Sequence, residues 1–206
     1  MFEREDDTIQ EQERRSFETK IAYVFKICLI GDGGVGKTCI ARRLCFDTFE
    51  ANTQLTIGID FYTYDIPIIV RGNKNKVRLS IWDFGGQEQF KKLFKYYING
   101  ANGIFLVFDL LKMETLIKLD WWYDNLIEHN LHERPKVLIG TKLDLVQKNN
   151  KKHKVDELTI ENFLDKHDEK DFLKTSSKEN TNILHSFKEM TKKIMDSHEL
   201  DYDKIL

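Results

Sequence analysis

Continuous apolar runs alternate along the chain with segments whose apolar residues recur every three or four positions. The runs AYVFKICLI (22–30), GIFLVFDL (103–110) and PKVLIG (135–140) lack regular polar alternation, and this is typical of strands buried on both faces of a sheet. Segments with helical spacing follow the first two runs, within 31–46 and across 114–130. The alternation predicts an α/β fold with a mostly parallel sheet.

Two β-rich runs interrupt this alternation in the first half of the chain. They cover 58–70 and 76–84 and are separated by the polar turn RGNKNK, which begins at Arg71 and predicts a hairpin with one antiparallel strand. Near the C-terminus, the patterns predict helices at 159–167 and 181–196 and a short strand at 171–177. No internal repeat or linker is visible, so one domain is expected.

The glycine-rich stretch GDGGVGKTC lies between the first predicted strand and the following helix. Gly31, Gly36, Lys37 and Thr38 match the spacing G-x-x-x-x-G-K-[ST]. Glycines let the backbone wrap closely around an anion, and the N–H groups and the positive end of the helix then point at that anion. The stretch therefore predicts a phosphate-binding loop, with Lys37 on the outer phosphates and the Thr38 hydroxyl on a bridging Mg²⁺.

The segment TKLD indicates which base the nucleotide carries. The Asp144 carboxylate can accept two hydrogen bonds from guanine, whereas adenine would leave this charge unpaired, and the stem of Lys142 can cover the purine face. The loops GDGGVGKT, DFGGQE, TKLD and SSK each follow a predicted strand. In open α/β sheets such loops meet at one edge, where ligands bind. We therefore expect a guanine-nucleotide site there.

These segments together resemble the Ras superfamily of small GTPases, and most of all its Rab branch, over about residues 22–196. The resemblance is also carried by TIGIDF (56–61), WDFGGQE (82–88), YINGANGIFLVFD (97–109) and TSSKEN (175–180). It implies a Ras-like P-loop G domain with a six-stranded, mostly parallel sheet, one antiparallel strand and about five flanking helices. It also implies a switch that binds GTP or GDP with Mg²⁺ and hydrolyses GTP slowly, in trafficking or signalling.

The resemblance assigns catalytic and metal-binding roles to residues of the two switch segments. Thr56 would be the switch I threonine on Mg²⁺, and Asp83 would hold the same ion through water. The Gly86 amide would contact the γ-phosphate, and Gln87 would orient the attacking water, with Lys37 as the other catalytic residue. Thr38 would complete the metal set.

The resemblance also places residues around the base. Phe49 would stack on the guanine, Ser176 would support Asp144, the Ser177 amide would bind the guanine oxygen and Lys178 would pack beside the ring. The full set expected to contact the nucleotide is Gly31, Gly33, Gly34, Val35, Gly36, Lys37, Thr38, Cys39, Phe49, Thr56, Gly86, Thr141, Lys142, Asp144, Ser176, Ser177 and Lys178.

The chain departs from the Rab pattern at several positions. Thr141 stands where Rab and Ras proteins have Asn, and switch II opens with Asp-Phe-Gly-Gly rather than Asp-Thr-Ala-Gly. Phe84 is bulkier than its counterpart, and Gly85 is expected to add backbone freedom. The RGNKNK turn is expected to lengthen the hairpin between the switches. No cysteine follows Cys45, where a prenylated Rab carries one near its C-terminus.

Composition and charge limit the partners. The net charge is −2, so no global basic field points to nucleic acid. The three cysteines are too clustered for a disulfide framework, and no metal-ligand spacing of Cys or His occurs. The resemblance implies an effector, an exchange factor and an activating protein, bound through the switches and the aromatic residues Phe61, Trp82 and Tyr97. Ordinary packing of these aromatics is the alternative. We expect a monomer.

The ends of the chain bear on its location. Residues 1–20 carry seven acids and four bases and are expected to be a flexible extension to a GTPase domain at 21–198, with a short tail at 199–206. Phe2 excludes myristoylation, and neither a signal peptide nor a membrane-spanning run is present. The expectation is a cytoplasmic protein without an intrinsic lipid anchor, which reaches a membrane only through a partner.

Two other functions remain open from the residues alone. One is a nucleotide-dependent scaffold with little hydrolysis, against which Gln87 argues. The other is a small-molecule kinase with the same phosphate loop, whose lid arginines are not evident in the sequence. A single-turnover hydrolysis assay and competition by ATP would distinguish them.

Overall fold

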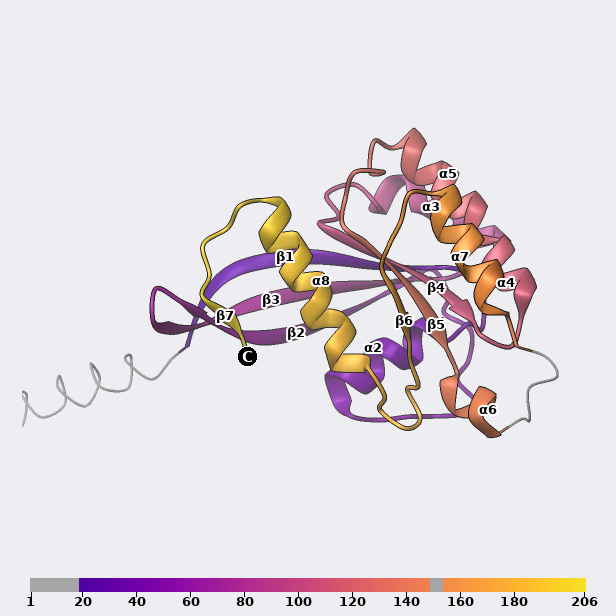
Figure 1. The fold of residues 1–206 in the computed structure, drawn as a ribbon, viewed down its shortest axis with the longest axis horizontal. Helices are drawn as coiled ribbons and strands as arrows, with labels where there is room; N and C mark the ends of the chain where they lie inside the picture. The colour runs from indigo at the N-terminus through magenta and orange to yellow at the C-terminus, as the bar shows by residue number, and fades with distance from the viewer. Residues whose placement is uncertain (1–18, 149–153) are drawn as a thin grey trace, which may run out of the picture.

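The structure is a computed structural model that describes residues 19–148 and 154–206. The first eighteen residues, and with them nearly all of the expected extension at 1–20, lie outside the described residues. A central sheet with helices on both faces forms the molecule (Figure 1). Its strands are β1 (Lys20–Ile30), β2 (Ile59–Val70), β3 (Asn73–Phe84), β4 (Gly103–Asp109), β5 (Lys136–Thr141), β6 (Phe172–Lys174) and β7 (Lys204–Ile205).

The strand order is β6-β5-β4-β1-β3-β2-β7. Strands β1, β3, β4, β5 and β6 pair in parallel, and β2 is antiparallel to both of its neighbours. The prediction of a mostly parallel sheet with one antiparallel strand is therefore confirmed. β4 and β5 are buried along their whole length, as their unbroken apolar runs predict.

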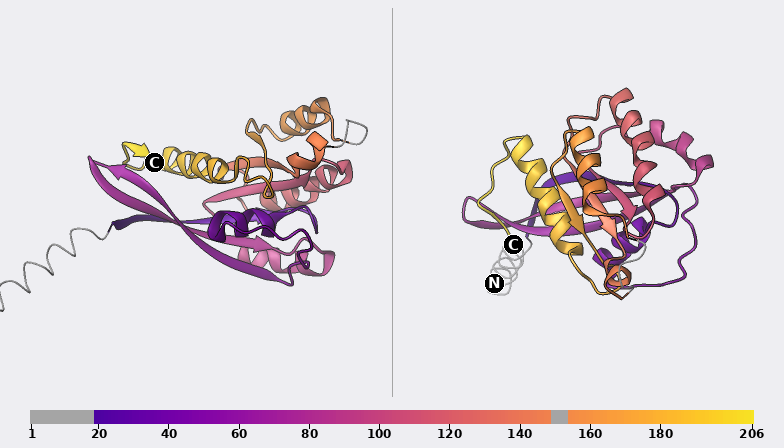
Figure 2. Two further views of the ribbon diagram at one scale, coloured as in Figure 1. Left: turned by 90° about the horizontal axis from the view of Figure 1, so that it is seen from below. Right: turned by 45° about the vertical axis from the view of Figure 1, so that its right-hand side comes forward.

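The turn between β2 and β3 is tighter than the sequence suggests. Pairing continues to Val70 opposite Asn73, so only Arg71 and Gly72 form the turn, with φ of 50° and 75°. Positive φ at both central residues is the geometry that matches the twist of a two-residue hairpin. The polar residues after Gly72 extend β3 rather than lengthening a loop, and the hairpin reaches past the helices (Figure 2).

The sheet has one strand more than the six that were expected. Within the described residues the sheet has seven, because Lys204 and Ile205 of the expected tail pair with Ile69 and Ile68. The outer edge of β2 has backbone N–H and C=O groups that no neighbouring strand would otherwise bind, and β7 forms hydrogen bonds with part of them.

Helices cover both faces of the sheet. They are α2 (Lys37–Phe46), α3 (Glu88–Tyr97), α4 (Met113–Ile117), α5 (Leu119–Glu128), α6 (Leu143–Lys148), α7 (Glu157–Lys166) and α8 (Ile183–Ser197). About five were expected. The described residues form more helical segments because one residue, Lys118, separates α4 from α5, and because α6 is a short helix after β5. α3 was not predicted from the pattern.

Two hydrophobic cores lie on opposite sides of the sheet. One contains residues of α2 and α8, such as Ile40 and Phe187, and the other contains residues of α3, α5 and α7, such as Phe94 and Trp122. Successive residues of β1 enter different cores, as period-two geometry requires. Within 19–148 and 154–206, no helix is both long and apolar enough to cross a bilayer.

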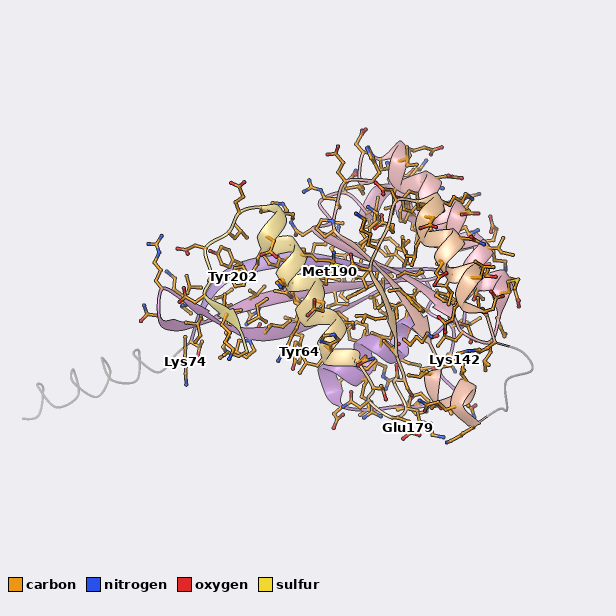
Figure 3. The ribbon with its side chains drawn as sticks, in the orientation of Figure 1. Tyr64, Lys74, Lys142, Glu179, Met190 and Tyr202 are labelled. Atoms are coloured by element: carbon orange, nitrogen blue, oxygen red, sulfur yellow. The ribbon has the colours of Figure 1, made fainter. Side chains whose placement is uncertain are left out.

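The two ends of the sheet differ in what they carry. Figure 3 shows Lys142 and Glu179 at one end, among the loops that follow the parallel strands, and Lys74 and Tyr202 at the other, near the β2–β3 turn. The first end contains the candidate site.

Candidate functional site

A cavity lies where the loops after β1, β3, β5 and β6 meet the segment between α2 and β2. These four loops follow different strands, and the topology brings them to one edge, as the sequence predicts. The expected site residues that line it are Gly33, Gly34, Gly36, Lys37, Thr38, Cys39, Phe49, Thr56, Gly86, Gln87, Thr141, Lys142, Asp144, Ser177 and Lys178. The other expected residues each form a hydrogen bond with a lining residue; they are Gly31, Val35, Asp83 and Ser176.

The glycine-rich loop has a backbone that side chains would prevent. A Cβ at Gly31 would lie 2.1 Å from the Val107 carbonyl oxygen, and φ at Gly31 is 144°. Gly36 caps the N-terminus of α2 with φ of 106°. The loop therefore ends at the N-terminus of a helix, whose first backbone N–H groups have no partner within the helix. This is the arrangement that binds phosphate.

The Lys37 side chain is buried at the base of this loop. Its Nζ donates hydrogen bonds to the carbonyl oxygens of Gly31 at 2.9 Å and Asp32 at 2.8 Å. Burial lowers its pKa to about 8, while the nearby carboxylates of Asp83 and Asp32 act in the opposite direction. A cation in this position can neutralise an anion that the loop holds.

Three side-chain oxygens converge next to Lys37. The hydroxyls of Thr38 and Thr56 are 2.8 Å apart, and both contact Oδ2 of Asp83, Thr56 at 3.2 Å. Asp83 Oδ1 is buried and finds no hydrogen-bond partner in the described part of the chain, and burial raises the Asp83 pKa to about 6 although Lys37 opposes this. Hard oxygen ligands with one carboxylate suit Mg²⁺, which also keeps water and substrate phosphates as ligands. The residues therefore fit a magnesium ion.

The base end of the cavity is organised around Asp144, in the first turn of α6. Its side chain is buried, and Oδ1 accepts a hydrogen bond from the Ser176 hydroxyl at 2.7 Å. Lys142 adopts a positive φ of 64° and its Nζ binds Gly34 O at 3.0 Å and Asp109 Oδ2 at 2.7 Å. The lysine stem thus crosses from the TKLD loop to the phosphate loop.

Thr141 also connects these two loops. Its hydroxyl donates to the carbonyl oxygen of Val35 and lies 3.0 Å from that of Phe108. A threonine in place of the family's asparagine therefore still makes a bond between the TKLD segment and the phosphate loop. This contact gives a physical reason for the departure at this position.

Switch II is packed closely against the phosphate loop and switch I. A Cβ at Gly86 would lie 2.3 Å from the Asp32 carbonyl carbon, and one at Gly85 would lie 2.8 Å from the Thr56 oxygen. The Gly85 amide also donates to the Gly58 oxygen at 2.8 Å. Gly85 therefore permits close approach of two backbones. Phe84 is buried in the second core.

The aromatic residues Phe61 of β2, Trp82 of β3 and Tyr97 at the end of α3 lie together. The ring centroids of Phe61 and Trp82 are 4.5 Å apart, and those of Trp82 and Tyr97 are 6.2 Å apart. Phe61 is 59% exposed and Tyr97 is 43% exposed, while Lys26 Nζ lies 3.6 Å from the Trp82 ring centroid. The cluster is thus both packed internally and accessible.

Sequence reasoning missed several residues of the site. The cavity is also lined by Glu50, Ala51, Thr53, Gln54, Leu55 and Leu145. Most of them lie between Phe49 and Thr56, so a loop bounded by two site residues was the available signal. The role of Asp109 in holding Lys142 was also missed, although its place at the end of a buried strand could have indicated it.

Comparisons with known proteins agree with this geometry. A sequence model of the Ras family matches residues 26–196. The chain is 35% identical over 174 residues to Ras-related protein Rab-8B of Pongo abelii, covering 84% of this chain and 79% of that protein. It is 36% identical over 172 residues to Ras-related protein Rab-1A of Dictyostelium discoideum, covering 84% of this chain and 81% of that protein.

Proposed function

This chain belongs to the Ras family, in which it is a Rab-like small GTPase, and from this premise we propose which residues bind its ligands and carry its reaction. It binds GTP and GDP, hydrolyses GTP and acts as a molecular switch. The rival function of a small-molecule kinase is thereby set aside, and a scaffold that scarcely hydrolyses GTP is not favoured. We place the GTPase domain at about residues 21–198, with β7 of the following tail added to its sheet.

The phosphates are bound by the glycine-rich loop. The backbone amides from Gly33 to Thr38 surround them at the start of α2, and Lys37 neutralises the outer phosphates. A magnesium ion would be held by the hydroxyls of Thr38 and Thr56, and Asp83 would reach it through water. When bound, this ion neutralises charge that develops on the phosphates. Support comes from the three converging oxygens and from the unpartnered Oδ1 of Asp83.

The base is recognised at the opposite end of the cavity. Asp144 accepts hydrogen bonds from the guanine N–H groups, and the Ser176 hydroxyl fixes the orientation of its carboxylate. Lys142 and Phe49 cover the two faces of the ring. The Ser177 amide binds the guanine oxygen, and Lys178 packs beside the ring. A buried carboxylate without these donors would be costly, so adenine is rejected.

Hydrolysis depends on switch II. The Gly86 amide contacts the γ-phosphate, and Gln87, which lines the cavity, orients the attacking water. Switch I, at 49–56, contains no arginine and so supplies no cation at the far side of the phosphate, and we expect slow turnover by the chain alone. An activating protein that supplies an arginine would raise the rate.

Effectors, exchange factors and the activating protein bind through the switches and through Phe61, Trp82 and Tyr97. The exposure of this aromatic cluster beside both switches supports that assignment. Cys28, Cys39 and Cys45 are free thiols, which fits a reducing compartment, and we place the protein in the cytoplasm as a monomer.

The observation that carries the proposal is that one cavity has magnesium ligands at one end and the Asp144–Ser176 pair at the other. The test is displacement of a fluorescent GDP from the intact chain by GTP, GDP and ATP, followed by single-turnover GTP hydrolysis with and without Mg²⁺. We expect ATP to compete at least about 10³-fold more weakly than GTP. Phosphate release should require Mg²⁺. Equal displacement by ATP and GTP would contradict the assignment.

A further inference from the structure

The outer edge of β2 is occupied by a segment from the other end of the chain. β7 pairs with it antiparallel, with Ile68 opposite Ile205 and Ile69 opposite Lys204 (Figure 1). Among the described residues, no other strand pairs with this edge. An open edge is a template for any extended chain, so what covers it decides which partners can bind there.

The backbone contacts run from the covering segment to β2. The Asp203 amide donates to the Ile69 oxygen at 2.8 Å, and the Leu206 amide donates to the Pro67 oxygen at 2.9 Å. Pro67 has no N–H group, so at this position β2 can only accept. These bonds would form with any extended segment and supply affinity without specificity.

Two acids of the covering segment supply specificity at the hairpin turn. Asp201 Oδ2 lies 2.6 Å from Arg71 Nε, and Asp203 Oδ2 accepts a hydrogen bond from the Gly72 amide at 2.7 Å. The acids are two residues apart, so an extended backbone presents both on one side. The positive φ of Gly72 belongs to the tight turn that carries this amide.

Apolar side chains of the same segment pack against the rest of the domain. Leu200, Tyr202 and Ile205 pack against the core that contains α2 and α8, and the Tyr202 hydroxyl donates to Asp196 Oδ1 at 2.6 Å. Figure 3 places Tyr202 near the hairpin end of the sheet. A hollow remains between residues 202–205 and α8, so the segment is not fully packed against this helix.

We propose that the β2 edge from Pro67 to Gly72 is a docking site for an extended peptide with the pattern acid–x–acid–x–aliphatic. Residues 201–205 have this pattern and occupy the site in cis. A partner protein that carries such a segment therefore binds only by displacing them. Arg71 and the Gly72 amide select the acids, and the apolar surface that Ile205 contacts selects the aliphatic residue. The site lies at the far end of the sheet from the nucleotide cavity.

The test uses the intact chain with one acid of the covering segment reversed. Asp203→Lys removes the contact with Gly72 and places a cation near Arg71. Glu199→Lys is the matched control, because Glu199 is exposed and its side chain forms no hydrogen bond or ion pair within 19–148 and 154–206. GDP binding is measured on both variants and should be unchanged, which separates this site from the nucleotide site.

Amide hydrogen exchange and peptide titration give the outcome. In Asp203→Lys, exchange at the Gly72 and Leu206 amides should rise about tenfold, with no rise in Glu199→Lys. A synthetic peptide of residues 199–206 should then shift the Ile69 and Gly72 amide resonances of Asp203→Lys at about tenfold lower concentration than for the unmodified chain, because the cis segment no longer competes. A scrambled peptide should have no effect.

Three results would overturn the proposal. Unchanged exchange in Asp203→Lys would mean that the segment does not occupy the edge through this contact. Peptide binding that is equal in all chains, or absent from all of them, would mean that the edge is no peptide site. Concentration-dependent dimerisation of Asp203→Lys without a peptide effect would mean that a second copy, rather than an acidic peptide, is the ligand.

Discussion

At the scale of single residues, the proposed choice of base depends on the hydrogen bonds available to one buried carboxylate. Asp144 is only 6% exposed, and the Ser176 hydroxyl holds one of its oxygens. A carboxylate in this setting requires donors from its ligand, because water does not reach it freely. Guanine supplies two donors and adenine supplies none on that edge.

We therefore expect Asp144→Asn to lose affinity for GTP by about 10²-fold or more and to gain affinity for xanthosine triphosphate, whose extra carbonyl needs a donor. Fluorescent-nucleotide titration measures both. Ser176→Ala removes only the supporting bond and should cost about tenfold in GTP affinity without changing the preferred base. Unchanged GTP preference in Asp144→Asn would remove the role given to this residue.

Gln87 is the residue that we propose to orient the attacking water in GTP hydrolysis. Its side chain lines the cavity beside Gly33, and it immediately precedes α3. Gln87→Leu should bind GTP normally and hydrolyse it at least about tenfold more slowly, because nothing then orients the attacking water. Single-turnover phosphate release gives the rate, and Gln89→Leu, an exposed neighbour in α3, is the control. If Gln87→Leu hydrolyses GTP at the wild-type rate, another group orients the attacking water.

At the scale of elements, the switch II helix α3 packs on the domain through Phe94, together with the buried residue that follows the helix, Ile98. Phe94 is its only buried residue, and its ring lies 5.8 Å from that of Phe84 and 5.4 Å from that of Trp122 between centroids. Lys91 also packs on α5, with its Nζ 4.3 Å from the Trp121 ring centroid, whereas Tyr96 and Tyr97 are exposed. The position of Gln87 therefore depends on the packing of Phe94 against α5.

Phe94→Ala should lower the free energy of unfolding by about 3–5 kcal/mol, because it leaves a cavity between α3 and α5. It should also slow GTP hydrolysis more than it weakens GDP binding, since Gln87 loses its support while the base site does not. Urea unfolding and single-turnover kinetics test the two effects. Tyr96→Ala, on the same helix but 67% exposed, should change stability by less than about 0.5 kcal/mol. Equal effects of both variants would contradict this account.

The elements differ in how far the sequence could predict them. β4 and β5 were predictable because every residue in them is buried, so their sequences are unbroken apolar runs. α3 was missed for no lack of signal, since Phe90, Leu93, Phe94 and Tyr97 recur every three or four positions as in an amphipathic helix. β7 was missed for a different reason, since two residues among charged neighbours become a strand only through pairing with β2.

At the scale of the whole molecule, the sequence predicted which loops meet but not the contacts that join them. Parallel topology alone brings the phosphate loop, switch II and TKLD to one edge. The bonds from Thr141 to Val35 and from Lys142 to Asp109 depend on side-chain directions in three dimensions. The aromatic cluster of Phe61, Trp82 and Tyr97 was predictable only through the family resemblance.

Because these loops come from all parts of the chain, the bound ligand should stabilise the entire domain. A ligand at 100 times its Kd stabilises the native state by about 2.7 kcal/mol, and for a domain of this size each kcal/mol raises Tm by roughly 2–4 °C. The chain loaded with GDP and Mg²⁺ should thus melt roughly 5–10 °C above the same chain after nucleotide removal with EDTA. Thr38→Ala should show a smaller EDTA effect, because it lacks one hydroxyl of the set formed with Thr56 and Asp83. Calorimetry at fixed nucleotide concentration measures these differences, and an EDTA effect as large in Thr38→Ala as in the unmodified chain would show that Thr38 does not hold the ion.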